Sequence, residues 1–118
     1  MDISADLKGF IENGALSLST VNEHNTPHTI YVMSVKVIGK NKILVTDNYM
    51  RETKENISFN KNVSLSILIG DAAYELKGTA EYFSNGPLVE QIKKIPENMG
   101  FPCKGAIIIS IKKIKKMG

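Results

Sequence analysis

The segment from Asp47 to Asn56 holds the residues best suited to bind an anion. A β-rich run ends at Thr46, a polar turn follows, and a short helical pattern begins at Thr53. The start of a helix leaves backbone N–H groups unpaired and carries a partial positive charge, so phosphates bind there readily. Arg51 is the only arginine, against fourteen lysines, and its planar guanidinium suits bidentate phosphate contacts. This chemistry fits a phosphate-bearing ligand.

The same residues also fit an ordinary joint between a strand and a helix. Asp47 and Asn48 are typical turn residues, and Thr53 is a common helix N-cap. Arg51 and Lys54 can be solvated charges on a surface helix. On local chemistry alone this second interpretation carries more weight, because such joints are common.

The remaining reactive side chains exclude several kinds of site. Cys103 is the only cysteine, which excludes an internal disulfide and a multi-cysteine metal site, and we interpret it as a small buried apolar residue. His24 and His28 are too few for a metal site built from imidazoles alone. We expect His28 at the rim of a pocket and His24 in an exposed turn. No nucleophile–base pair or glycine-rich phosphate loop is recognisable, so no catalytic residue is assigned.

The elements that must position this segment are mostly strands. Alternating and β-branched runs predict six strands, over residues 15–21, 28–38, 43–46, 63–69, 73–83 and 106–114. Short helices are predicted over residues 3–13, 53–60 and 88–95. Gly78 indicates a bulge or a close backbone approach within its strand. Because strands follow one another in runs, the pattern favours an antiparallel sheet closing toward a barrel over a parallel βαβ sheet.

The bulk composition fits one small folded domain over residues 1–118. Hydrophobic residues make up 42% and tryptophan is absent, so the core must consist mainly of Ile, Val and Leu. A chain of this length buries one core but no deep private cavity. A large ligand would therefore lie at the surface or between subunits.

The net charge of +3 comes from a local lysine-rich tail. Without its four lysines the chain has 11 basic and 12 acidic residues, a net of −1; they are Lys112, Lys113, Lys115 and Lys116. We interpret the tail as an exposed strand face, and we expect no nucleic-acid binding. The acidic N-terminus does not resemble a signal peptide, and no apolar run approaches the ~20 residues of a membrane span. We therefore expect a cytoplasmic protein without membrane contact.

Several short segments together carry a resemblance to a known family. They are residues 18–21 with the polar turn before Pro27 and His28, the hairpin that follows, Met50-x-x-Thr53-x-x-Asn56, and residues 62–65, 76–80 and 104–106. In this order the chain resembles the FMN-binding split barrels related to pyridoxamine 5′-phosphate oxidase, and most of all the small homodimeric FMN-binding proteins of anaerobic microbes. The resemblance covers nearly the whole chain. It implies a mainly β fold, a six-stranded antiparallel split barrel with two or three short helices.

The resemblance also implies which residues hold FMN. The backbone of one strand contacts the isoalloxazine ring, at Tyr31, Val32, Met33 and Ser34. A strand end and turn line the ribityl chain and the ring, at Thr46, Asp47, Asn48, Tyr49 and Met50. The start of a helix holds the phosphate, at Arg51, Thr53 and Lys54. Tyr31, Tyr49 and Phe101 are candidates to cover the ring, and a second subunit completes the pocket, so a homodimer is implied.

Glu52 departs from the family pattern, which commonly has a lysine immediately before the threonine. A carboxylate close to a phosphate dianion is repulsive, most strongly where both are desolvated. Either Glu52 points to solvent while Arg51 or Lys54 supplies the charge, or flavin binding is weak or lost. Our hypothesis is that Arg51 compensates.

These observations lead to one functional hypothesis and two alternatives. The first is an FMN-binding flavoprotein with a redox role, either electron transfer with a protein partner or a flavin-dependent oxidoreductase acting on a small molecule. The second is a split-barrel binding module that has lost FMN or binds another cofactor such as haem or a deazaflavin, and Glu52 is its best support. The third is a dimerisation domain without a ligand.

Overall fold

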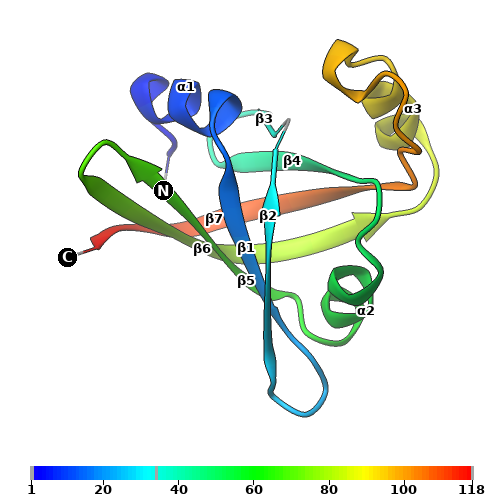
Figure 1. The fold of residues 1–118 in the computed structure, drawn as a ribbon, viewed down its shortest axis with the longest axis horizontal. Coiled ribbons are helices and arrows are strands. Elements are labelled where there is room, and N and C mark those ends of the chain that lie inside the picture. The colour runs from blue at the N-terminus through cyan, green and yellow to red at the C-terminus, as the bar shows by residue number, and fades with distance from the viewer. Residues whose placement is uncertain (1, 34, 118) are drawn as a thin grey trace.

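The computed structural model describes residues 2–33 and 35–117. Within them, one antiparallel sheet of seven strands is accompanied by three α-helices and one 3-10 helix (Figure 1). The strands are β1 (Leu16–Val21), β2 (Pro27–Val32), β3 (Lys36–Val37), β4 (Lys42–Asp47), β5 (Asn62–Ile69), β6 (Ala72–Phe83) and β7 (Gly105–Met117). The helices are α1 (Ala5–Asn13), α2 (Arg51–Phe59), α3 (Pro87–Lys93) and the 3-10 helix η1 (Pro96–Asn98).

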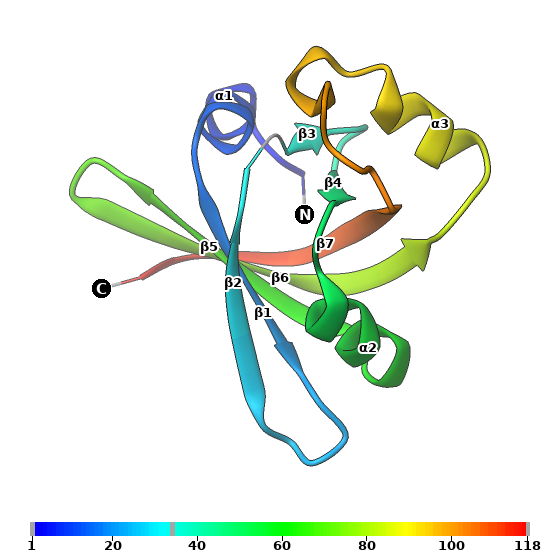
Figure 2. The same ribbon diagram turned by 45° about the vertical axis from the view of Figure 1, so that its right-hand side comes forward.

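The sheet is curled so that its two edges approach one another. Its strand order is β2-β1-β5-β6-β7-β4-β3, which puts β2 and β3 at opposite edges. Only residues 33–35 separate these two strands in the chain. The chain passes from β2 across β3 to β4 and on to α2 (Figures 1 and 2). Because so short a link joins opposite edges, the sheet must close toward a barrel that stays split between them.

The predicted strand over residues 28–38 is two strands, so the prediction of six strands is corrected to seven in the described chain. β2 pairs with β1, with Thr20 opposite His28. β3 pairs antiparallel with β4 around the turn at residues 39–41, so the hairpin is present, but it joins the two strands through only two residue pairs. The β-branched run continues across the split although its hydrogen-bond partners change. The mainly β, antiparallel fold itself is confirmed.

α2 begins two residues earlier than predicted, at Arg51 in place of Thr53. Its N-cap is Met50, whose own side chain makes no capping bond. The Met50 N–H instead donates to Asp47 Oδ1 at 2.7 Å, a side-chain bond that closes the turn between β4 and the helix. Thr53 therefore lies in the first turn of α2 and does not cap it.

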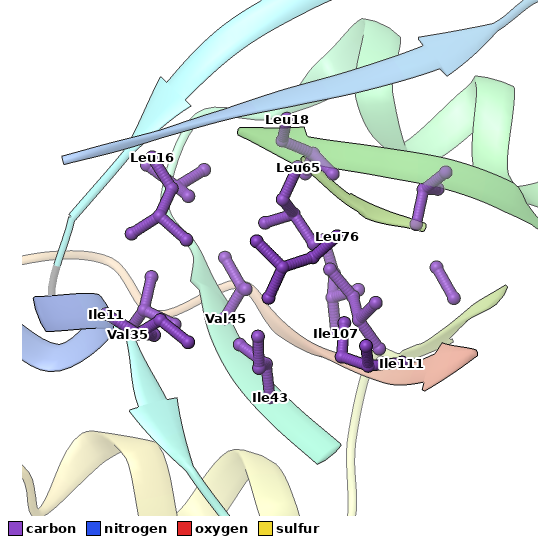
Figure 3. Packing of buried hydrophobic residues seen from close by; sticks show 14 of the residues in the cluster. Ile11, Leu16, Leu18, Val35, Ile43, Val45, Leu65, Leu76, Ile107 and Ile111 are labelled. Carbon is purple, nitrogen blue, oxygen red and sulfur yellow. The ribbon is translucent and has the colours of Figure 1, made fainter. Parts of the chain in front are cut away.

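The core lies inside the curled sheet and consists of aliphatic side chains, as the composition predicted (Figure 3). Its largest fully buried side chains are all Ile or Leu. Ile11 brings α1 onto one end of this core. Gly78 lies at a register shift between β6 and β7, where a Cβ would overlap the backbone carbonyl of Ser110, so the predicted bulge with a close approach is confirmed.

A second, smaller cluster fixes α3 and the segment after it. It contains Leu44, Val89, Ile92, Cys103 and Ala106. Cys103 is 4% exposed, which confirms its interpretation as a small buried residue. Among the described residues, no helix has the length and apolar character needed to span a bilayer.

Candidate ligand-binding site

A cavity of about 590 Å³ lies where the barrel is split. Its walls are β2, the end of β4 with its turn, the first turn of α2, and the segment that contains η1. β2 is an edge strand, so one row of its backbone N–H and C=O groups has no strand partner. A volume of this size is within the range of about 300–1,000 Å³ that is typical of sites for organic ligands.

Nine of the twelve residues predicted to bind the cofactor line this cavity. They are Tyr31, Val32, Met33, Thr46, Asn48, Tyr49, Met50, Arg51 and Thr53. Asp47 and Lys54 are not in its lining. Ser34 lies outside the described residues. The predicted segment therefore comes together around one space, while its contact with a ligand remains a prediction.

Asp47 organises the turn from beneath the cavity. Its side chain is 2% exposed. One carboxylate oxygen accepts the Met50 N–H, and the other accepts a hydrogen bond from the Tyr82 hydroxyl of β6. Burial, reinforced by the hydrogen bond and the negative charge of Asp47, raises the pKa of Tyr82 above its ordinary value. Gly105 leaves room for the Tyr82 ring, which a Cβ at that position would overlap.

Three hydrogen bonds join this turn to the segment after α3. Asn48 Oδ1 accepts the Cys103 N–H at 2.9 Å, and the Asp47 carbonyl accepts the Lys104 N–H at 2.8 Å. Asn98 Nδ2 donates to Thr46 Oγ1 at 3.0 Å. The segment that forms the far wall of the cavity is thus hydrogen-bonded to the end of β4 and is not a free loop.

The first turn of α2 presents unsatisfied donors to the cavity. The first main-chain bond of the helix runs from the Lys54 N–H to the Met50 carbonyl at 2.9 Å, so the N–H groups of residues 51–53 have no helical acceptor. The Thr53 hydroxyl is buried and has no hydrogen-bond partner within the described chain. Asn56 Nδ2, one turn later, donates to Thr20 Oγ1 at 3.0 Å and anchors α2 on β1. This end of the cavity has the polarity that an anionic oxygen requires.

Charged side chains flank this helix start. Arg51 is 95% exposed, and its Nε lies 3.8 Å from Glu55. The ammonium of Lys54 lies 5.0 Å from the centre of the Tyr82 ring. Glu52 turns to β2, where its Oε2 lies 2.6 Å from Nδ1 of His28. The Glu52 carboxylate is therefore occupied by His28, a pairing that the sequence did not reveal.

Large apolar side chains stand exposed around the cavity. Tyr31, Met33, Tyr49 and Phe101 line it and are 77%, 69%, 72% and 52% exposed. Lys104 stacks over the Tyr49 ring at 5.8 Å. Exposed apolar groups gathered around a cavity typically mark a ligand or partner surface.

Sequence reasoning missed Ile30, Glu97 and Asn98 as lining residues. Ile30 precedes Tyr31 on β2, and the alternation of residues along this strand is the one sequence feature that could have predicted its position. Asn98 is 3% exposed and also donates to the Ile92 carbonyl at 2.8 Å. Glu97 Oε1 lies 3.4 Å from Nζ of Lys36. The pKa of the Glu97 carboxyl is lowered, mainly by a hydrogen bond from its own backbone N–H and also by the hydrogen bond from Lys36. Glu97 and Asn98 are distant in sequence from the other lining residues, and only the fold brings them to the cavity.

The profile of the family described as pyridoxamine 5′-phosphate oxidase matches residues 3–118, and the chain belongs to this family. The fold is accordingly the split barrel that the sequence predicted. A relative from Methanocaldococcus jannaschii, an uncharacterized protein, is 29% identical over 109 residues, covering 88% of this chain and 73% of that protein.

Three solved structures share the fold. HupZ of Group A Streptococcus is 22% identical with a TM-score of 0.88, covering 98% of this chain and 94% of that one. An FMN-binding protein of Syntrophomonas wolfei is 16% identical with a TM-score of 0.73, covering 92% and 78%. A protein named F420 reductase is 17% identical with a TM-score of 0.71, covering 96% and 98%.

Proposed function

We propose that this protein binds FMN in the cavity between β2 and α2 and has a redox role. The observation that carries the proposal is the Thr53 hydroxyl, which lines the cavity, is 1% exposed and lacks a partner among the described residues. Leaving a buried hydroxyl unpaired costs about 1–3 kcal/mol. A phosphate oxygen at this helix start would satisfy both that hydroxyl and the unpaired N–H groups beside it.

The remaining walls suit the rest of a flavin. The free edge of β2 offers backbone donors and acceptors to the polar edge of a ring system. Tyr31, Tyr49 and Phe101 offer aromatic surface to its faces. The fold shared with the FMN-binding protein of Syntrophomonas wolfei supports this choice of ligand.

The bound flavin would supply the electron chemistry, while the chain binds, orients and shields it. We propose electron transfer or reduction of a small molecule, in a cytoplasmic protein. We further propose a homodimer with the cavity at the subunit interface. The exposed Tyr31, Met33 and Phe101 support it, since a second subunit would cover them.

Substituting Thr53 tests the proposal directly. Thr53→Val keeps the shape of the side chain and removes the hydroxyl, so the FMN Kd is expected to rise about tenfold, as for loss of one charge-assisted hydrogen bond. Riboflavin lacks the phosphate, and its Kd is expected to stay unchanged. Fluorescence quenching of each flavin measures both constants, and Thr26→Val, in the exposed β1–β2 turn, is the matched control. A wild-type protein that fails to take up FMN would refute the proposal.

A deazaflavin is the second candidate ligand. The similarity in fold to the protein named F420 reductase favours it. Competition between FMN and the deazaflavin F420 for the same cavity separates the candidates. If an equimolar amount of F420 displaces FMN, F420 is the preferred ligand of the cavity in place of FMN.

A further inference from the structure

His28 and Glu52 meet at the end of the cavity where α2 begins. Nδ1 of His28 lies 2.6 Å from Oε2 of Glu52, and both residues line the cavity. The two side chains are 28% and 63% exposed. Because the Glu52 carboxylate lies against Nδ1, Nε2 is the ring nitrogen that remains for another partner.

The permanent cations near this end of the cavity are directed elsewhere. Arg51 is almost fully exposed and pairs with Glu55, while Lys54 lies over the Tyr82 ring. Lys36 pairs with Glu97 on the far wall. His28 is thus a partly buried side chain of the cavity wall that can acquire a positive charge, and it lies against Glu52, the residue before Thr53.

We propose that the His28 imidazolium, oriented by Glu52, is the cation that the cavity offers to the phosphate of its ligand. The inference rests on the proposed binding of a phosphate-bearing flavin. With neutral His28 the pair carries a net charge of −1, and one proton taken from solvent at Nε2 brings it to zero. Protonation therefore removes the negative charge that opposes a phosphate and adds a charge-assisted donor. Because histidine side chains gain their charge in mildly acidic solution, the contribution of His28 to FMN affinity should be larger at about pH 6 than at about pH 8.

The other charged groups around His28 do not replace this role. From α2, Arg51 and Glu55 neutralise each other beside Glu52. In the turn between β1 and β2, His24 pairs with Glu23 at 3.6 Å, and both are largely exposed. On β1, the residue opposite His28 is the uncharged Thr20. Glu97 lines the cavity from η1 and is paired with Lys36.

The test compares wild type, His28→Gln and His24→Gln in FMN titrations at about pH 6 and about pH 8, on either side of the ordinary histidine titration. His28→Gln is expected to weaken FMN binding about tenfold at the lower pH and less than about twofold at the higher. The phosphate of FMN titrates in the same range, so the ratio of variant to wild-type Kd is taken at each pH. His24→Gln, which alters the exposed histidine, should match wild type.

Riboflavin tests whether His28 acts through the phosphate of FMN. Its Kd should be the same for wild type and His28→Gln at both pH values, because it has no phosphate. Equal losses for FMN and riboflavin would overturn the inference, as would equal FMN constants for wild type and variant at the lower pH. If wild type binds FMN and only the histidine effect is missing, the proposed function stands and this inference fails. If wild type binds no FMN, both fail.

Glu52→Gln provides a second, independent measurement. Glutamine keeps the size of the side chain but carries no charge, so the variant removes the carboxylate beside His28. At about pH 8 the variant should bind FMN more tightly than wild type, since the repulsion is gone. ¹⁵N NMR of the His28 ring should show a larger imidazolium fraction after FMN is added. Equal FMN constants for Glu52→Gln and wild type at about pH 8, or an unchanged ring spectrum, would overturn the inference.

Discussion

At the scale of single residues, the Tyr82 hydroxyl donates a hydrogen bond to the Asp47 carboxylate, next to the turn that borders the cavity. Asp47 is nearly inaccessible to solvent, and its two oxygens receive the Met50 N–H and the Tyr82 hydroxyl. The Tyr82 ring in turn occupies the space above Gly105 and lies under the Lys54 ammonium. The pair therefore sets where β4 ends and where α2 begins.

Tyr82→Phe should lower the free energy of unfolding by about 1–3 kcal/mol, because Asp47 loses a buried donor. Tyr74→Phe, in the same strand, is the matched control, because Tyr74 and Tyr82 are both partly buried against the core. Urea unfolding at neutral pH measures both, and equal stabilities of the two variants would contradict the role given to this pair.

The raised pKa of Tyr82 adds a dependence on pH. The folded protein keeps this proton above about pH 10, where an unfolded tyrosine releases it. The contribution of Tyr82 is thus complete below about pH 10 and is lost as the pH rises further. The gap in stability between wild type and Tyr82→Phe should narrow in that alkaline range.

At the scale of elements, the site depends on how η1 is attached to the sheet. Asn98 makes two buried hydrogen bonds, to Thr46 on β4 and to the Ile92 carbonyl of α3. It therefore joins a helix, a short 3-10 turn and a strand end. The cavity wall that carries Phe101 follows directly after it.

Asn98→Ala should cost about 1–3 kcal/mol of stability, because Thr46 and Ile92 lose a buried donor. It should also speed amide hydrogen exchange in residues 99–104 while leaving β5 and β6 protected. Asn85→Ala, in the exposed turn after β6, is the control and should change neither quantity. Unchanged exchange in the Asn98 variant would show that the segment is held by other contacts.

The sequence predicted a strand well where its residue pattern is uniform and the whole strand pairs with the same neighbouring strands. β5 and β6 were predicted closely because alternating residues meet a single core face. The break between β2 and β3 was missed, since the residue types stay β-forming while the strand partners change. Likewise Thr53 was expected to cap α2, but the bond from the Met50 N–H to Asp47 closes the preceding turn and the helix starts earlier. Most of the segment from Thr46 to Thr53 lines one cavity, which the sequence predicted, whereas the presence of Asn98 and Glu97 there depends on long-range packing.

At the scale of the whole molecule, the cavity is bordered by exposed apolar side chains from two separate parts of the chain. Tyr31 and Met33 lie at the end of β2 and Phe101 follows η1, and all three are more than half exposed. Covering them with a second copy would enclose the proposed flavin and compensate for the small size of the chain.

Sedimentation equilibrium should therefore give a mass of about twice the 13.0 kDa of the chain. Addition of FMN should lower the concentration at which the dimer dissociates, because a ligand bound at an interface stabilises it by mass action. Bovine serum albumin serves as the mass standard. A monomer at all concentrations, with and without FMN, would rule out the shared site.

The place of β7 in the sheet has a consequence for how the fold is assembled. β7 follows all the other strands in sequence, yet it lies between β6 and β4 and joins the two parts of the sheet. The strands β1, β2, β5 and β6 can pair with one another before β7 is in place, whereas β4 is connected to β6 only through it. Docking of β7 is therefore the step that completes the sheet and fixes the end of β4, from which the turn bordering the cavity begins.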